Sequence, residues 1–155
     1  MRKARAKKRP LAPDPRYQDQ LVTRFVNDMM ISGKKSIAYK CFYDAMDIVE
    51  EKTNESGVDV WKKALNNIMP MVEVKSRRIG GATFQIPVEI RADRKISQGI
   101  KWMILYARKR NGKSMAEKLS SEVLAAAKGE GAAVKKKEDT HKMAEANKAF
   151  SHFRV

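Results

Sequence analysis

Residues 72–90 read VEVKSRRIGGATFQIPVEI, and this stretch differs from the rest of the chain in its periodicity. Apolar and polar residues alternate with a spacing of two on both sides of Gly80-Gly81. This alternation around a pair of glycines is typical of two strands joined by a tight turn. The stretch therefore predicts a β-hairpin at about residues 72–90.

We expect this hairpin to close with a loop of odd length. A two-residue loop would place the apolar residues of the two strands on opposite faces. A three-residue loop, Gly80-Gly81-Ala82, pairs Val74 with Val88 and keeps a single apolar face. Pro87 has no N–H to donate and indicates an edge strand. Because an isolated hairpin is marginally stable, its base should pack on helices while its tip projects.

Helical periodicity flanks the hairpin on both sides. Apolar residues recur at spacings of three and four from about Asp19 to Pro70 and again from Asp93 to about Phe150. Breaks divide these segments into about six helices, and they fall at Gly33, residues 54–57, Asn111-Gly112 and Gly129. The predicted fold is mainly α, a helical bundle with one inserted, protruding β-hairpin.

Three polar residues stand where helices should begin. Ser36 and Asp59 are candidate N-caps of the second and third helices. Ser114 is followed three residues later by Glu117, which is the pattern of a capping box. Trp61 and Trp102 follow helical spacing, so we expect both to pack in the core.

The first 13 residues form a basic arm. They crowd six cations together with few apolar residues, so the segment should be flexible and disordered when alone. The prolines at positions 10, 13 and 15 then delay helix formation. The predicted organisation is an arm over residues 1–13 and a single helical domain over residues 14–155.

The charge of the chain is strongly positive. Lys and Arg number 33 and Asp and Glu 18, which gives a net charge of +15 and a pI of about 10.0. Such an excess repels itself unless a polyanion neutralises it, and nucleic acid is the commonest one. The rival partner, an anionic membrane surface, would need a strongly amphipathic exposed helix. No apolar run approaches the about 20 residues that span a bilayer.

No catalytic or metal-binding constellation is visible. The single cysteine, Cys41, falls in an apolar helical stripe, and the two histidines, His141 and His152, lie in the C-terminal segment. Their spacing does not resemble a zinc site. We therefore expect no enzyme activity, cofactor or metal.

The cations fall in clusters at loops, helix ends and the hairpin tip, where they could converge on one RNA surface. The helix N-termini near Asp93 and Ser114 add backbone N–H groups suited to phosphate. The candidates for RNA contact are Arg2, Lys3, Arg5, Lys7, Lys8 and Arg9 in the arm, Lys34 and Lys35 in the first helix–helix loop, Lys75, Arg77 and Arg78 near the hairpin tip, Arg91, Arg94, Lys95 and Lys101 on the next helix, Arg108, Lys109, Arg110, Lys113, Ser114 and Met115 around the following turn, and Lys135, Lys136 and Lys137 on the last helix.

Six stretches of the sequence resemble the bacterial small-subunit ribosomal protein seven family over essentially the whole chain. The most specific is PMVEVKSRRIGGATFQIP at residues 70–87, and AVKKKEDTHKMAEANKAF at residues 133–150 is nearly as specific. The others are PDP at 13–15, GKKS at 33–36, ARKR at 107–110 and KSMA at 113–116. The opening of the arm and the end at Phe153-Arg154-Val155 depart from the family's common pattern.

The resemblance implies a structural protein of the small ribosomal subunit in the cytoplasm. It implies that the chain binds the 3′ major domain of small-subunit ribosomal RNA and nucleates assembly of the head. The hairpin tip would lie near the exit-site tRNA and the mRNA path. Head and platform proteins, among them proteins nine and eleven, would be neighbours. The alternatives are a DNA-compacting architectural protein and a nucleic-acid-processing enzyme.

Overall fold

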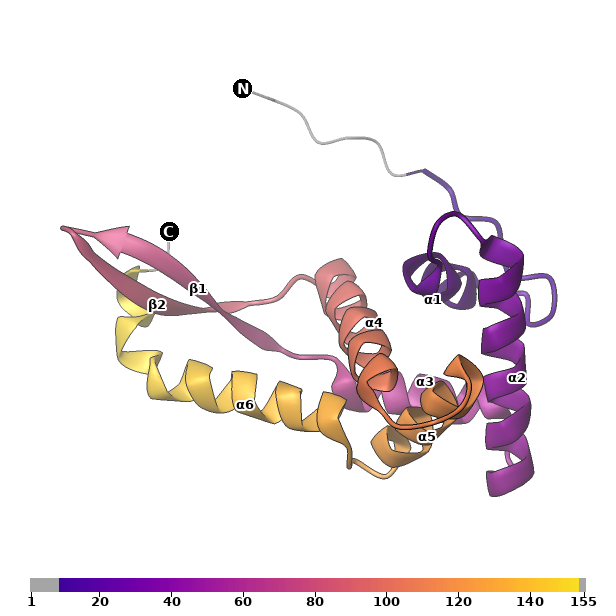
Figure 1. Cartoon of the computed structure of the whole chain (residues 1–155). Helices are drawn as coiled ribbons and strands as arrows, with labels where there is room; N and C mark the ends of the chain where they lie inside the picture. Colours follow the sequence, from indigo (N-terminus) through magenta and orange to yellow (C-terminus); the bar gives the residue numbers. More distant parts are fainter. Residues whose placement is uncertain (1–8, 154–155) are drawn as a thin grey trace. The chain divides into compact units, whose positions relative to one another are not determined.

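The computed structural model describes residues 9–153, which form six α-helices, one 3-10 helix and one antiparallel pair of strands (Figure 1). The strands are β1 (Val72–Ile79) and β2 (Ala82–Glu89). The helices are α1 (Gln20–Met29), α2 (Lys35–Thr53), α3 (Gly57–Ile68), α4 (Ala92–Lys109), α5 (Met115–Ala127), α6 (Ala132–Ala146) and the 3-10 helix η1 (Lys148–Phe153). The mainly α fold with an inserted hairpin is confirmed.

The chain divides into two compact units, one up to Lys40 and one from Cys41 onward, with α2 spanning the boundary. This division leaves the expected single domain over residues 14–155 a prediction. The predicted disordered arm is also untested, because residues 1–8 lie outside the part of the chain that the structure describes.

In the first unit, two carboxylates organise the entry to α1. Asp14 is completely buried and accepts the backbone N–H groups of Arg16 and Tyr17 at 3.0 and 2.9 Å. Asp19 caps α1 by accepting the N–H of Leu21 at 2.7 Å. Each side chain satisfies backbone donors that no carbonyl within the helix can reach. The start of the first helix at about Asp19 is thus confirmed and has a physical cause.

The core of the second unit is built from α3, α4 and α5, which pack on one another. Trp61 is fully buried, and its ring meets that of Phe42 edge-on with centroids 5.4 Å apart. Trp102 is 8% exposed, so the prediction that both tryptophans are core residues is confirmed.

The turn from α2 into α3 requires a residue without a side chain. A Cβ built on Gly57 would lie 2.5 Å from the backbone oxygen of Met46, closer than real Cβ contacts allow. Gly57 is the first residue of α3, so the predicted cap at Asp59 is wrong and Asp59 lies in the first turn. Ser36 likewise lies within α2, which begins at Lys35. Both predictions placed the helix start slightly too late.

The predicted capping box of α5 is confirmed in outline. The hydroxyl of Ser114 accepts the N–H of Glu117 at 3.2 Å. The carboxylate of Glu117 reaches back to the N–H of Lys113 at 3.0 Å, one residue before the cap. Two backbone donors at this helix start therefore have internal partners.

The predicted register of the hairpin is wrong. Val74 pairs with Pro87 and Ile79 pairs with Ala82, so the loop contains only Gly80 and Gly81. Both glycines have positive φ, 56° and 90°. A two-residue turn with two positive φ values matches the twist of the strands, and glycine adopts it without steric cost. Turn chemistry therefore overrides the expected single apolar face.

The C-terminal segment supports the hairpin, and both of its parts touch the strands (Figure 1). At the base, Val72 and Pro87 line an open hollow of about 340 Å³ with Ala144 of α6. Nearer the tip, the ring of Phe84 lies 5.2 Å from that of Phe150 in η1. A two-stranded ribbon twists strongly, so opposite faces can meet the same segment at its two ends. This confirms that the hairpin packs on a helix. No helix among residues 9–153 is long and apolar enough to cross a membrane.

Candidate nucleic-acid interface

In the first unit the candidate cations are exposed. Arg9, Lys34 and Lys35 all reach solvent, and the other arm candidates (Arg2, Lys3, Arg5, Lys7 and Lys8) lie outside the described residues. Lys34 stands in the loop between α1 and α2, directly after Gly33 with φ of 73°. The ammonium of Lys35 lies 5.6 Å above the ring of Tyr39, a cation–π distance. Lys34 in the α1–α2 loop and Lys35, the first residue of α2, therefore present two adjacent cations to solvent.

In the second unit, Glu73 gathers the cations at the hairpin base. Arg94 Nε lies 2.9 and 3.1 Å from its two carboxylate oxygens, and the ammonium of Lys75 is 3.5 Å away. The Glu73 side chain is 15% exposed, whereas Arg94 and Lys75 are 58% and 60% exposed. The carboxylate thus joins α4 to the hairpin while most of both cationic side chains faces solvent.

Further cations continue from this point. Arg91 is the N-cap residue of α4 and is exposed, Lys95 is half-buried, and Lys101 is exposed farther along the helix. Arg77 and Arg78 are exposed on β1. The structure therefore joins Lys75 of the hairpin and Arg94 of α4, which are separate in sequence, into one basic surface through Glu73.

The cluster around the α4–α5 turn has a divided role. Arg108, Lys109 and Lys113 are exposed, and Ser114 presents the N-terminus of α5 with Met115 as its first residue. Arg110 instead forms an ion pair with Glu122, whose side chain is fully buried. The second oxygen of Glu122 accepts the N–H of Ala133 at the start of α6. Arg110 therefore joins α4, α5 and α6 and is a structural residue first.

The three lysines of α6 are also unequal. Lys135 is exposed, Lys136 is half-buried, and Lys137 donates to the carbonyl oxygen of Asn67 at 2.6 Å. Asn67 lies in the last turn of α3, where carbonyls lack partners within the helix. Lys137 thus stabilises a helix end, which leaves Lys135 as the best placed of the three to meet a ligand.

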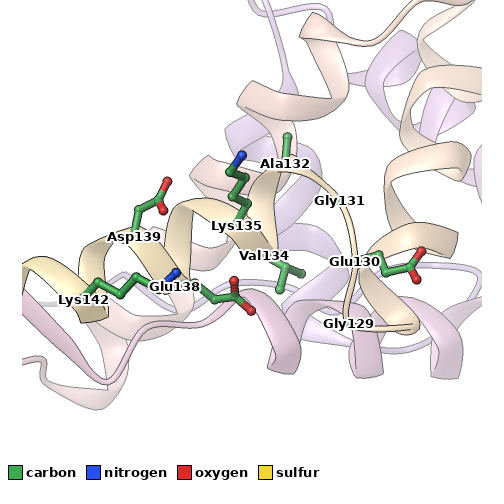
Figure 2. Close-up of a pocket in the computed structure, with 9 residues that line it drawn as sticks. All are labelled: Gly129, Glu130, Gly131, Ala132, Val134, Lys135, Glu138, Asp139 and Lys142. Carbon is green, nitrogen blue, oxygen red and sulfur yellow. The ribbon is translucent and has the colours of Figure 1, made fainter.

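Figure 2 shows the surroundings of Lys135, an open hollow of about 520 Å³ beside the α5–α6 loop. Its charged side chains fan outward along the loop and α6 instead of converging on one point. The charges are mixed, and they belong to Glu130, Lys135, Glu138, Asp139 and Lys142. A phosphate would meet three carboxylates here, so this hollow is a poor anion site.

His141 has a structural role. Its Nε2 accepts the backbone N–H of Met71 at 3.1 Å, which anchors the chain to α6 just before β1. Burial lowers the pKa of His141 below the ordinary 6.5, and the positive charge of Lys137 lowers it further. The neutral ring is the form that can accept, which agrees with this contact. Among residues 9–153, no three His, Cys, Asp or Glu side chains gather into a metal site.

Sequence reasoning missed the two carboxylates that organise the cations, Glu73 and Glu122. Their partners Arg94 and Arg110 lie 21 and 12 residues away along the chain. One signal was available for Glu122, because it interrupts the apolar stripe of Leu119 and Val123. Glu73 alternates with valines like any exposed strand residue, so the pattern gave no signal there.

Comparison with known proteins decides the family. The family model described as ribosomal protein S7p/S5e matches residues 1–148. The chain belongs to the ribosomal protein S7p/S5e family. Small ribosomal subunit protein uS7 of Flavobacterium psychrophilum is 74% identical over 99% of both chains. The proteins of that name from Flavobacterium johnsoniae and Amoebophilus asiaticus are 69% and 61% identical, over 99% and 100% of both chains.

Membership of the S7p/S5e family settles the class of protein. Members of this family are structural proteins of the ribosome and not enzymes, and they bind ribosomal RNA. Ribosomal RNA is therefore a partner whose phosphates the exposed clusters of Lys and Arg can neutralise. The identification of the family from residues 70–87 and 133–150 is confirmed.

Proposed function

We propose that the chain binds the 3′ major domain of small-subunit ribosomal RNA and nucleates assembly of the subunit's head in the cytoplasm. Its hairpin tip then lies near the exit-site tRNA and the mRNA path. Proteins nine and eleven of the same subunit are its neighbours. The observation that carries this proposal is the basic surface joined through Glu73, which combines a projecting ribbon with the start of α4.

The chemistry of this surface suits a folded RNA backbone. Residues 75–86 contain three cations and no Asp or Glu, so nothing on the outer ribbon repels phosphate. Lys and Arg that meet phosphates release condensed counterions, which favours binding and makes it depend strongly on salt. The buried tryptophans are not available as stacking platforms, so contact with phosphates and sugars dominates.

Scaffolding needs rigid elements that hold cations at fixed separations. Glu73 fixes Arg94 and Lys75 relative to the ribbon, and Glu122 fixes the start of α6 relative to α4. Cations on such elements lose little conformational entropy when RNA strands meet them. The proposed role is therefore to hold several RNA helices close together by neutralising their phosphates.

A filter-binding competition at about 150 mM salt tests this function. Labelled RNA from the 3′ major domain competes against an unrelated structured RNA and against duplex DNA. We expect the ribosomal fragment to win by at least about 100-fold, a lower bound because specific binding usually exceeds non-specific binding by about 10³-fold or more. Equal competition by duplex DNA would instead support a DNA-compacting protein. Equal competition by the unrelated RNA would show that the chain does not select the 3′ major domain, which would contradict the proposal.

A further inference from the structure

The two adjacent arginines of the hairpin lie on opposite faces of the ribbon. Arg77 pairs with Phe84, and Arg78 pairs with Thr83. In an antiparallel ribbon, directly opposed residues share a face and successive residues alternate between faces. Strand alternation therefore separates the two charges, and the observed register places Arg77, not Arg78, on the face of Phe84.

The face that carries Arg77 is covered near the tip by the C-terminal segment. Phe84, opposite Arg77, is half-buried and its ring lies 5.2 Å from Phe150. Ile86, two residues farther along the same face, is only 3% exposed. Figure 1 shows the C-terminal segment running beside the ribbon toward its tip. Near the tip, this face of the hairpin therefore packs against the C-terminal segment.

The opposite face, which we term the Arg78 face, consists of Ser76, Arg78, Thr83 and Gln85. Ser76 pairs with Gln85 and Arg78 with Thr83, and all four residues are exposed. In contrast to the Arg77 face, this part of the ribbon contains no apolar side chain to bury. It offers solvent a guanidinium, an amide and two hydroxyl groups.

These groups match the backbone of an RNA strand. The guanidinium can donate two parallel hydrogen bonds to a phosphate. Hydroxyl and amide side chains both donate and accept, as does the ribose 2′-hydroxyl that distinguishes RNA from DNA. The Arg78 face carries no aromatic ring and no carboxylate, so it can neither stack on bases nor repel phosphate.

We infer that the two faces of residues 76–85 differ in function: the Arg78 face binds the sugar–phosphate backbone of an RNA strand, whereas the Arg77 face near the tip packs against the C-terminal segment. The inference rests on the proposed function, because it assumes that the hairpin meets RNA in the assembled subunit. Arg78 then contributes contact with RNA, whereas Arg77 extends a surface that the C-terminal segment already occupies.

Site-specific photo-crosslinking in reconstituted small subunits tests the division. The photoreactive residue p-azidophenylalanine replaces Gln85 in one variant and Phe84 in another. These neighbours lie on opposite faces, and at Phe84 the replacement keeps the aromatic ring. After irradiation, labelled ribosomal RNA, tRNA and mRNA are followed in separate arms, which identifies the source of any crosslinked RNA.

We expect RNA crosslinks from position 85 and only protein crosslinks from position 84. RNA crosslinks of equal yield from both positions, from position 84 alone or from neither would overturn the division between faces. Failure of the unsubstituted chain to enter small subunits would instead overturn the proposed function. A second comparison gives an independent readout, since Arg78→Gln should reduce the RNA crosslink from position 85 and Arg77→Gln should leave it unchanged.

Discussion

Arg110 and Glu122 form an ion pair in which the carboxylate is completely buried and the guanidinium is partly exposed. The carboxylate also accepts the N–H of Ala133, so one acidic group holds α4, α5 and α6 together. A buried charge is tolerated only when such partners replace its hydration. The junction is therefore a sensitive point in the second unit.

Replacement of Arg110 should destabilise the fold. Arg110→Ala leaves the Glu122 carboxylate buried without its cation, and we expect a loss of about 3 kcal/mol in the free energy of unfolding. Urea titration of the full chain measures this. Lys113→Ala removes an exposed cation from the same turn and should cost less than about 0.5 kcal/mol. Equal losses in the two variants would contradict the structural role of Arg110.

His141 should make stability depend on pH in mildly acidic solution. The folded state lowers the pKa of His141 below 6.5, chiefly through burial, so the unfolded chain binds this proton more readily. The contribution of His141 to stability is complete above pH 6.5 and is lost as the pH falls through the lower, folded-state pKa. Stability measured against pH should show this decline in the natural chain and in His152→Gln. The decline should be smaller in His141→Gln, and an unaltered curve would contradict the prediction.

Gly57→Ala should destabilise the second unit through a steric clash. The new Cβ would lie 2.5 Å from the backbone oxygen of Met46, and backbone atoms cannot move aside cheaply. We expect a loss of about 1–3 kcal/mol by thermal or urea unfolding. Gly112→Ala is the matched control, because the nearest atom there, at 3.0 Å, is the side-chain Cγ of the flexible Lys118. If Gly112→Ala loses as much stability as Gly57→Ala, the loss comes from replacing a glycine as such, and the predicted clash with Met46 is contradicted.

Two lysines of α6 should separate stability from RNA binding. Lys137→Ala removes the donor to the Asn67 carbonyl and should lower the free energy of unfolding by about 1 kcal/mol. Lys135→Ala should leave stability unchanged and reduce the salt dependence of RNA binding by about one counterion. Unfolding curves and binding titrations at several salt concentrations test both. A loss of stability in Lys135→Ala but not in Lys137→Ala would contradict the structure.

Deletion of residues 1–12 should weaken RNA binding without unfolding the rest of the chain. The deleted segment carries six cations and precedes Asp14, which is completely buried. Affinity for the ribosomal RNA fragment should fall, and the salt dependence should become less steep. Circular dichroism provides the check on folding. An unchanged affinity would show that the arm makes no RNA contact.

Local rules predicted much of this fold. Ser114 caps α5 as its capping-box pattern predicts, α1 begins at about Asp19 as its periodicity predicts, and the alternating stretch at residues 72–90 forms the expected hairpin. The predicted register was wrong because two rules conflict in this stretch. A two-residue glycine turn and a single apolar face cannot both be satisfied, and the turn determines the register. The starts of α2 and α3 lie two and three residues before those that the predicted caps imply, because helix boundaries are the part of a helix least defined by sequence.

The candidate interface was predictable in composition but not in geometry. Runs of Lys and Arg located the clusters, and the family resemblance identified the partner. The sequence could not show which of Arg77 and Arg78 shares a face with Phe84, because this depends on a one-residue difference in register. Nor could it separate Lys137 from Lys135, since the partner of Lys137 lies 70 residues away. The cations that bind carboxylates or carbonyls cannot be identified from the sequence, because their partners lie on distant segments of the chain.

The support of the hairpin by the C-terminal segment has a consequence for synthesis. The strands are translated well before α6 and η1, so the ribbon emerges while its supporting helix does not yet exist. A lone two-stranded hairpin is marginally stable in water. The nascent ribbon therefore gains its support from the C-terminal segment only after α6 and η1 have left the exit tunnel, late in synthesis.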